Sequence, residues 1–307
     1  MKASETKLQK VIEGTVQYVI PLFQRSYSWD IKEWGVLWED IVELCETENP
    51  RTHFIGSIVS MPTVSVPEGV AKYLLIDGQQ RITTIFIILS LLRDRAREFN
   101  QRNVADEINE CYLVNKFKDG NDFFKLMPTQ IDRDTFMKII SNQEISYENQ
   151  ITRAYDFFKR KIKQKNIETE TLKKVITTYF SIVSIVLDAD DNPYLVFESL
   201  NSKGRPLTPA DLIRNYFFMR IHIDNQEQVY LQYWQPMQNA LNENLTEYIR
   251  HFLMRQGSIV KQSDVYYSLK EKVSPENAID YLSELNKFSK FYEKLLNPNH
   301  WCSKDKV

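Results

Sequence analysis

The order of hydrophobic and polar positions along the chain predicts a small sheet and many helices. Short segments rich in β-branched and apolar residues have the composition of strands, and they lie at residues 16–20, 53–60, 72–77 and 181–187. Longer segments carry apolar residues at the three- and four-residue spacing of a buried helix face. These helical segments are residues 30–46, 79–99, 104–115, 132–141, 147–164, 168–179, 192–200 and 208–223, together with most of the chain after residue 226. Residues 1–15 form a short helix or an extended lead-in, and the whole pattern predicts an α+β fold.

Capping signals mark the start of three of these helices. Asp30 precedes the first long amphipathic segment and is a suitable N-cap. Pro193 follows Asn192, which places proline at the first helical position. Thr208 and Asp211 have the spacing of a capping box. This structural role is enough to explain Asp211 without a contact to a ligand.

The polar residues between Asp77 and Arg81 interrupt two apolar segments. A strand ends at Asp77, Gly78 supplies a tight turn, and a helix begins at Gln79. The first N–H groups of a helix have no intrahelical partners, and the helix dipole favours negative charge there. A strand, a glycine turn and a helix start in this order predict an anion site.

This anion site has a functional and a structural interpretation. In the functional one, Arg81 and the helix N–H groups hold phosphates, with Thr83 or Thr84 helping, and Asp77 acts as a base or binds a metal-bound water. In the structural one, Asp77 is an N-cap and Arg81 is a surface charge. The sequence lacks the GxxxxGK[ST] phosphate loop that would decide the question, so both interpretations stay open.

A second polar stretch follows the strand at residues 16–20 and contains Gln24, Arg25, Tyr27 and Trp29. These residues could line a groove in which the aromatic rings stack on a base and Arg25 meets a phosphate. Alternatively, Tyr27 and Trp29 anchor a loop in the core.

Two further groups are candidates for contacts with a ligand. His53 could form a hydrogen bond across the pocket from the start of its strand, near Ser57, although a lone histidine there is usually structural. The second group lies around a glycine loop and the helix after it, and its members are Asn201, Arg205, Arg214 and Asn215. The basic run at residues 158–165 could touch a nucleic-acid backbone, but a solvated helix face explains it better.

Composition narrows the class of protein. A chain of 307 residues suffices for one large domain or two modest ones. The net charge of −2 excludes a generally basic nucleic-acid binder. The cysteines at 45, 111 and 302 show no ligand spacing, so we expect neither a zinc site nor disulfides, and the reducing cytoplasm suits them. We see no signal peptide, and the longest apolar run is too short to cross a membrane.

Four motifs in a fixed order carry a family resemblance. They are IPLFQRSYSW at residues 20–29, HFIGSIV at 53–59, LIDGQQRITT at 75–84 and FESLNSKGRPLTPADLIRN at 197–215. Together they resemble the N-terminal domain of GmrSD-type modification-dependent restriction enzymes, a domain similar to that of the SspE-like proteins of phage defence.

The resemblance implies a domain organisation. It implies a ParB/sulfiredoxin-like α+β core at residues 1–100 that carries the DGQQR motif. A helical region at 101–225, with one strand and the last of the four motifs, would pack back on the core. Residues 226–307 would form a helical C-terminal part that ends before a nuclease domain.

The resemblance also implies an activity, namely binding and hydrolysis of a nucleoside triphosphate with Mg²⁺, with GTP favoured. The catalytic residues would be Asp77, Gln79, Gln80 and Arg81. The nucleotide-binding residues would be Gly78, Thr83, Thr84, Gln24, Arg25, His53, Ser57, Asn201, Arg205, Arg214 and Asn215. Sensing of DNA or of its modification would involve Pro21, Tyr27 and Trp29, and no residues are assigned as ligands of a resident metal.

The chain departs from the full-length relatives of the family in one respect. Those relatives commonly end in a His-Me finger nuclease, whereas this chain has four histidines, at 53, 222, 251 and 300, and little sequence follows the last one. We therefore expect the nuclease to be a separate domain or subunit. The expected partners are a nucleotide, DNA with or without a modification, and that nuclease, with no membrane. The alternative function is a ParB-like sensor that binds nucleotide or modified DNA without hydrolysis.

Overall fold

The computed structural model describes residues 1–63, 69–145, 148–188, 191–201, 208–255, 257 and 259–296. The chain forms two compact units. Unit 1 consists of Met1–Pro21 and Arg25–Pro193, and unit 2 consists of Leu22–Gln24 and Tyr194–Val307. The domain boundaries at residues 100 and 225 expected from the sequence stay a prediction.

Unit 1 is built on a mixed six-stranded sheet with the order β1-β6-β3-β4-β2-β5. Strand β3 runs antiparallel to β4 and parallel to β6, and β2 runs parallel to both β4 and β5. The strands are β1 (Lys2–Lys7), β2 (Val16–Val19), β3 (His53–Pro62), β4 (Ala71–Asp77), β5 (Leu126–Met127) and β6 (Phe180–Val186). The α+β prediction is confirmed, and so are the four strands expected from the sequence.

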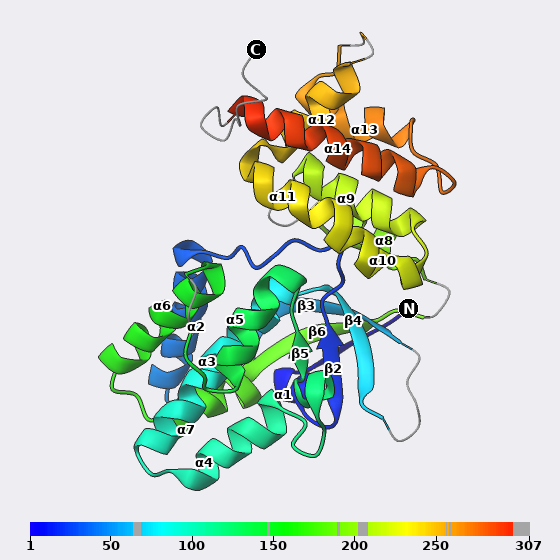
Figure 1. Cartoon of the computed structure of the whole chain (residues 1–307). Coiled ribbons are helices and arrows are strands. Elements are labelled where there is room, and N and C mark those ends of the chain that lie inside the picture. The colour runs from blue at the N-terminus through cyan, green and yellow to red at the C-terminus, as the bar shows by residue number, and fades with distance from the viewer. Residues whose placement is uncertain are drawn as a thin grey trace. The chain divides into compact units, whose positions relative to one another are not determined.

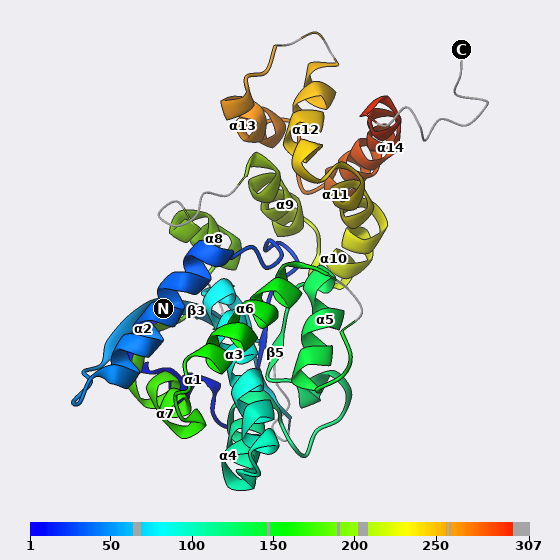
Figure 2. The ribbon, with the colours of Figure 1, turned by 90° about the vertical axis from the view of Figure 1, so that its left-hand side faces the viewer.

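The helices of unit 1 gather largely on one side of this sheet. In Figure 1, α2, α3, α5 and α6 lie to the left of the strands, and in Figure 2, which faces that side, they lie in front of them. One-turn π-helical segments follow α4 and α7, at Ile108–Leu113 and Val175–Tyr179. The helices are α1 (Leu8–Ile12), α2 (Ile31–Glu46), α3 (Gln79–Glu98), α4 (Arg102–Glu107), α5 (Gln130–Ile140), α6 (Gln150–Gln164) and α7 (Thr169–Lys174).

Helix α3 is the central element of the core of unit 1. Its first half is apolar on nearly every side, and the residues from Ile82 to Leu92 are all buried. The helix packs against α5, α6 and α7. Strand β4 is equally buried near its end, where Leu75 and Ile76 are fully covered. The turn between β4 and α3 is therefore held on both sides by buried elements.

Unit 2 contains helices and no strand within the residues that the structure describes. Thr208 caps α9 and forms the expected capping box with Asp211. Phe23 joins this unit, where its ring packs against Tyr194 and Phe197 at centroid distances of 4.4 and 5.4 Å. The helices are α8 (Pro193–Asn201), α9 (Pro209–Arg220), α10 (Ile223–Val229), α11 (Gln235–Leu241), α12 (Leu245–Met254), α13 (Val265–Lys270) and α14 (Ala278–Leu296). None of the described helices in either unit has both the length and the apolar composition that a membrane span requires.

Candidate functional site

The turn between β4 and α3 presents the N-terminal end of a 20-residue helix. Gly78 caps this helix in the left-handed region, with φ at 93°. A Cβ on Gly78 would lie 3.0 Å from Ile58 Cγ1 and 3.2 Å from the Ser57 carbonyl oxygen, so glycine suits both the backbone angle and the space. Because the first N–H groups of a helix have no intrahelical partner, this end of α3 attracts anions.

Arg81 lies in the first turn of α3, and its guanidinium occupies a gap in the neighbouring strand. Nη1 donates a hydrogen bond to the Ser57 carbonyl oxygen at 2.8 Å. Gly56 has φ at 109° and lies where the register of β3 against β6 shifts. A Cβ at Gly56 would come within 2.5 Å of Arg81 Nη2. Strand β3 therefore accommodates Arg81 by having no side chain at this position.

Arg81 forms no ion pair within the described part of the chain. No carboxylate there lies within ion-pair distance, and Ser57 is the one hydrogen-bond acceptor described for the side chain. Burial lowers the pKa of Arg81, and the nearby charge of Asp77 opposes this shift in part. A guanidinium carries five N–H donors and stays charged, so most of its donors remain available to a ligand.

Asp77 is the carboxylate nearest to this turn. Burial raises the pKa of its side chain, whereas a hydrogen bond from the Gly78 N–H and the charges of Arg81 and Arg25 act in the opposite direction. The charges of the two arginines thus stabilise the ionised form of the Asp77 carboxylate, whereas burial destabilises it. The cluster favours an added anion electrostatically, and Asp77 is placed to accept a proton.

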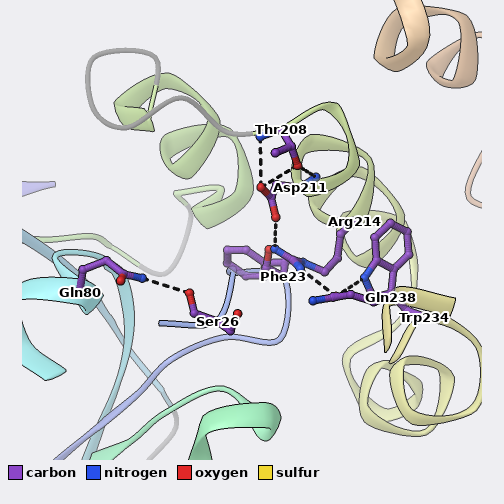
Figure 3. A network of polar contacts seen from close by, with 8 residues as sticks. All are labelled: Phe23, Ser26, Gln80, Thr208, Asp211, Arg214, Trp234 and Gln238. Carbon is purple, nitrogen blue, oxygen red and sulfur yellow. Dashed lines mark hydrogen bonds and ion pairs between the residues drawn. The ribbon is translucent and has the colours of Figure 1, made fainter. Parts of the chain in front are cut away.

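The two glutamines of the motif have different environments. Gln80 Oε1 accepts hydrogen bonds from the backbone N–H groups of Ser28, at 2.7 Å, and Trp29, at 3.1 Å. Its Nε2 donates to the Ser26 carbonyl oxygen at 3.3 Å, as Figure 3 shows. Gln79 is 8% exposed and has no side-chain hydrogen bond to any described residue. Gln80 thus holds a backbone segment in place, while the amide of Gln79 is available.

Tyr27 is an anchor of that same segment. It is buried, and its hydroxyl lies 2.6 Å from Thr84 Oγ1 and accepts a hydrogen bond from Trp34 Nε1 at 2.7 Å. The Tyr27 N–H donates to Asp132 Oδ2 at 2.7 Å. The structure thus gives Tyr27 the anchoring role considered from the sequence, with Thr84 as its hydrogen-bond partner. Thr83 is buried as well, and a nucleotide-binding role for Thr83 and Thr84 stays a prediction. A sensing role for Tyr27, and for the buried Pro21, stays a prediction.

A groove of about 310 Å³ opens beside Arg81, between α2 and β3. Its apolar lining includes Trp29, Val36 and Phe54. Close by, His53 Nε2 lies 3.3 Å from the carboxylate oxygen Oδ2 of Asp40, another lining residue. Trp29 and His53 are both candidates from the sequence, and both lie at or beside this groove.

Arg214 belongs to unit 2 and has structural partners there (Figure 3). Arg214 is buried and donates to the Phe23 carbonyl oxygen at 3.0 Å and to Asp211 Oδ1 at 2.8 Å. It also donates to Gln238 Oε1, which accepts a second hydrogen bond from Trp234 Nε1. These contacts give Arg214 a structural role. Its assignment to a nucleotide site stays a prediction.

The other sequence candidates lie in unit 2, outside the described residues, or on α6. Gln24 is buried and is counted with unit 2. Asn215 donates a hydrogen bond to the Tyr194 carbonyl oxygen at 3.3 Å, also within unit 2. Arg205 and the side chain of Asn201 lie outside the described residues. In the basic run, Lys159, Arg160 and Lys163 are exposed on α6, as on a solvated helix face.

Two residues that support the site carry no signal of this role in the sequence. Asp132, on α5, receives hydrogen bonds from the Tyr27 N–H and from Thr129 Oγ1. Gln150, on α6, donates to the Trp29 carbonyl oxygen at 2.7 Å. Both lie more than 100 positions away in the sequence from the segment that they hold. The polar residues of α5 and α6 have no local pattern that distinguishes these two.

The arrangement agrees with the result of a comparison with protein families. A family model described as the N-terminal domain of GmrSD restriction endonuclease matches residues 6–218, more than half of the chain. The match includes the turn at residues 77–81, the groove beside it and the capping box of α9. A comparison with curated proteins finds none that matches. The chain therefore belongs to the family of GmrSD restriction endonuclease N-terminal domains.

Proposed function

We propose that the N-terminal end of α3 binds the phosphates of a nucleoside triphosphate and supports its hydrolysis in a restriction system. The observation that carries the proposal is Arg81. It is largely buried, has one described hydrogen-bond acceptor and no described ion-pair partner, and lies at the positive end of α3. Burying a charge without a partner is costly, and a phosphate bound at this turn would supply the missing negative charge.

Each remaining polar group of the turn has a role in this scheme. Arg81 and Arg25 neutralise phosphate oxygens, and the free N–H groups of α3 donate hydrogen bonds to them. The amide of Gln79 orients the attacking water, a role that glutamine has in other nucleotide hydrolases. Asp77 accepts the proton of that water, and its raised pKa suits it to act as a base. Gln80 is a positioning residue, because its amide holds residues 26–29 in place.

The residues of the turn fit a magnesium ion that comes with its nucleotide. The described part of the chain contains no group of three or more potential metal ligands among histidine, cysteine, aspartate and glutamate. Magnesium usually keeps several of its waters when it is held by carboxylates and substrate phosphates. Asp77 would hold the ion through one of these waters, which leaves its carboxylate able to accept a proton. The ion would neutralise phosphate charge.

Family membership supports a role in a restriction system, with DNA as the target and a nuclease as the partner. We assign DNA cleavage to a separate nuclease domain or subunit. Nucleotide hydrolysis at α3 would then regulate that cleavage. GTP is the first nucleotide to test.

Hydrolysis assays of the purified chain and a variant of the turn test this proposal. GTP, ATP, CTP and UTP are each incubated with the chain and Mg²⁺, with and without modified DNA, and released phosphate is measured. Arg81→Ala should reduce hydrolysis at least tenfold, since a charge-assisted hydrogen bond contributes about 1.5–3 kcal/mol. Arg97→Ala, near the other end of the same helix, is the matched control and should hydrolyse normally. Four intact nucleotides under all conditions would contradict the proposal.

The second candidate function is a sensor that binds nucleotide or modified DNA without turnover. The observation that favours it is the open groove beside Arg81, in which Phe54 is 57% exposed. Arg81→Ala also separates the two functions. A sensor would lose binding and have no hydrolysis to lose, whereas a hydrolase would lose turnover as well.

A further inference from the structure

The groove between α2 and β3 leaves large apolar side chains uncovered beside a charged site. Phe54, on β3, is 57% exposed, and Val36, on α2, is 56% exposed. Trp29 is half-buried and lines the same groove. A concave surface with aromatic and aliphatic walls and a few polar groups is typical of a site for a small molecule.

Arg81 connects this groove to the turn at α3. Its guanidinium lines the groove, and its helix begins at the turn where we place the phosphates. A ligand that reaches from one place to the other must therefore carry negative charge at one end and an apolar, planar group at the other. A nucleoside triphosphate has this distribution of charge and apolar surface.

We propose that the groove holds the nucleobase and sugar of the nucleoside triphosphate whose phosphates lie at the N-terminal end of α3. This inference rests on the proposed function. It assigns the base and sugar to the residues of the groove, whereas the proposed function assigns the phosphates to the residues of the turn. The ring of Phe54 stacks on the base, because each of the four bases has a flat π-face that an aromatic side chain can cover. Trp29 and Val36 supply the remaining apolar contacts.

The polar residues of the groove suit the edge of a base. Glu33 and Asp40 both line it. Glu33 Oε2 accepts a hydrogen bond from the Asp30 N–H, and Asp40 Oδ2 lies next to His53. In each carboxylate the second oxygen has no described protein partner, and it can accept a hydrogen bond from an N–H group of a base. Lys32, also in the lining, is placed for a sugar hydroxyl or a phosphate.

The volume of the groove favours a single nucleoside over a DNA strand. At about 310 Å³ it lies at the lower end of the range for small-molecule pockets. Its charged neighbour, Arg81, is one desolvated guanidinium, whereas a groove for a strand needs a row of cations along the backbone. Binding of a DNA strand in the groove is the alternative that the Phe54 variants distinguish from binding of a nucleoside.

Calorimetric titration of the wild-type chain compares nucleoside triphosphates with inorganic tripolyphosphate, both in the presence of Mg²⁺. If the groove holds the base, at least one nucleoside triphosphate should bind about tenfold or more tightly than tripolyphosphate, the gain expected from stacking on one aromatic residue. Equal affinities for tripolyphosphate and all four nucleotides would overturn the inference and leave the phosphate site standing. Failure of every one of these ligands to bind would instead contradict the proposed function itself.

Variants of Phe54 test whether its ring stacks on the base. Phe54→Ala should weaken nucleotide binding about tenfold and leave tripolyphosphate binding unchanged. Phe54→Tyr keeps the ring and should keep the affinity. Phe117→Ala is the matched control, because Phe117 is 89% exposed and does not line the groove. Both positions are exposed enough for the variants to fold, and thermal unfolding verifies this.

Three results with the Phe54 variants would overturn the inference. In the first, Phe54→Ala binds nucleotide as tightly as the wild type does. In the second, Phe54→Ala binds nucleotide normally but loses affinity for a DNA oligonucleotide, which would assign the groove to DNA. A parallel loss of nucleotide and tripolyphosphate binding would also overturn it, because Phe54 would then support the phosphate site and not the base.

Discussion

Gly56 and Arg81 share one space in the molecule. The Arg81 guanidinium fills the position that a side chain at residue 56 would occupy, and a Cβ there would lie 2.5 Å from Nη2 and 2.8 Å from Cζ. The positive φ of Gly56 turns the strand so that the Ser57 carbonyl oxygen accepts a hydrogen bond from Arg81. The position of the charge thus depends on a residue without a side chain, 25 positions earlier in the sequence.

Gly56→Ala should therefore displace Arg81 and weaken phosphate binding. The positive φ alone costs an alanine on the order of 1–3 kcal/mol, and the clash with the guanidinium adds to this. Gly14→Ala is the matched control, because Gly14 also has a positive φ, at 84°, but a Cβ at this position would meet no atom within 4 Å. Chemical denaturation and tripolyphosphate titration compare the pair. Equal losses of stability and no loss of binding in Gly56→Ala would contradict this explanation.

The two neighbouring glutamines should give opposite results on substitution. Gln80→Ala leaves the N–H groups of Ser28 and Trp29 without their acceptor, so the free energy of unfolding should fall by about 1–3 kcal/mol. Gln80→Glu keeps an acceptor oxygen and should lose less. Gln79→Ala breaks no described hydrogen bond, so it should lose less stability than Gln80→Ala does, while hydrolysis falls.

Denaturation curves and phosphate-release assays on the three variants check this division of roles. Gln80→Glu serves as the control that separates the loss of an acceptor from the loss of the amide. If Gln79→Ala is the less stable variant and Gln80→Ala the less active one, the assignment of the two residues is reversed.

Arg214→Met should lower the free energy of unfolding. Its removal leaves Asp211 and the Phe23 carbonyl oxygen without a buried partner, and breaking a buried ion pair in this way costs about 3–5 kcal/mol. The control is Arg153→Met on α6, where the arginine side chain is 62% exposed and its ion pair with Glu148 is exposed as well, so the change should be within about 0.5 kcal/mol. Nucleotide affinity measured on the folded variants would decide whether Arg214 also binds the nucleotide. Weaker binding with unchanged stability would place Arg214 at the ligand.

The elements that could be predicted from the sequence are those whose composition differs from their surroundings. Strand β4 and helix α3 are apolar on most sides and are separated by Gly78, so their type and limits follow from pattern alone. Strand β1 could not be predicted, because it is mostly exposed and carries the polar sequence KASETK at the edge of the sheet. It pairs with β6, which lies almost 180 positions later. Such pairing has no local signal.

The candidate site also has a part that could be predicted from the sequence and a part that could not. The anion-binding end of α3 follows from local rules, since a glycine turn and a helix start are adjacent in the sequence. The place of Arg81 against Gly56 depends on a shift of register between β3 and β6. A glycine within a strand is a local sign of such an irregularity, but the sequence does not show which side chain enters the gap. The sequence also suggests the same chemistry for Gln79 and Gln80. Their roles separate only once residues 26–29 lie against Gln80.

Asp77→Asn should stabilise the chain at neutral pH and abolish hydrolysis. Burial raises the pKa of Asp77 in the folded state above the ordinary value of 3.8. The native state then binds more protons than the unfolded state between these two values, so stability falls as pH rises through that window. Asparagine has no charge to bury. The variant should match the wild type near pH 3, gain on it as pH rises, and be more stable at pH 7 by on the order of 1 kcal/mol.

Urea denaturation of both proteins at several pH values measures this difference. The carboxyl of Asp132, whose pKa burial also raises, is present in both proteins and cancels from the comparison. Asp134→Asn, at an exposed position on α5, is the control and should change stability by less than about 0.5 kcal/mol. If Asp77→Asn is instead the less stable protein at pH 7, then attraction to Arg81 and Arg25 outweighs the burial of the carboxylate. In that case the turn is already neutralised by Asp77 and would not attract a phosphate electrostatically.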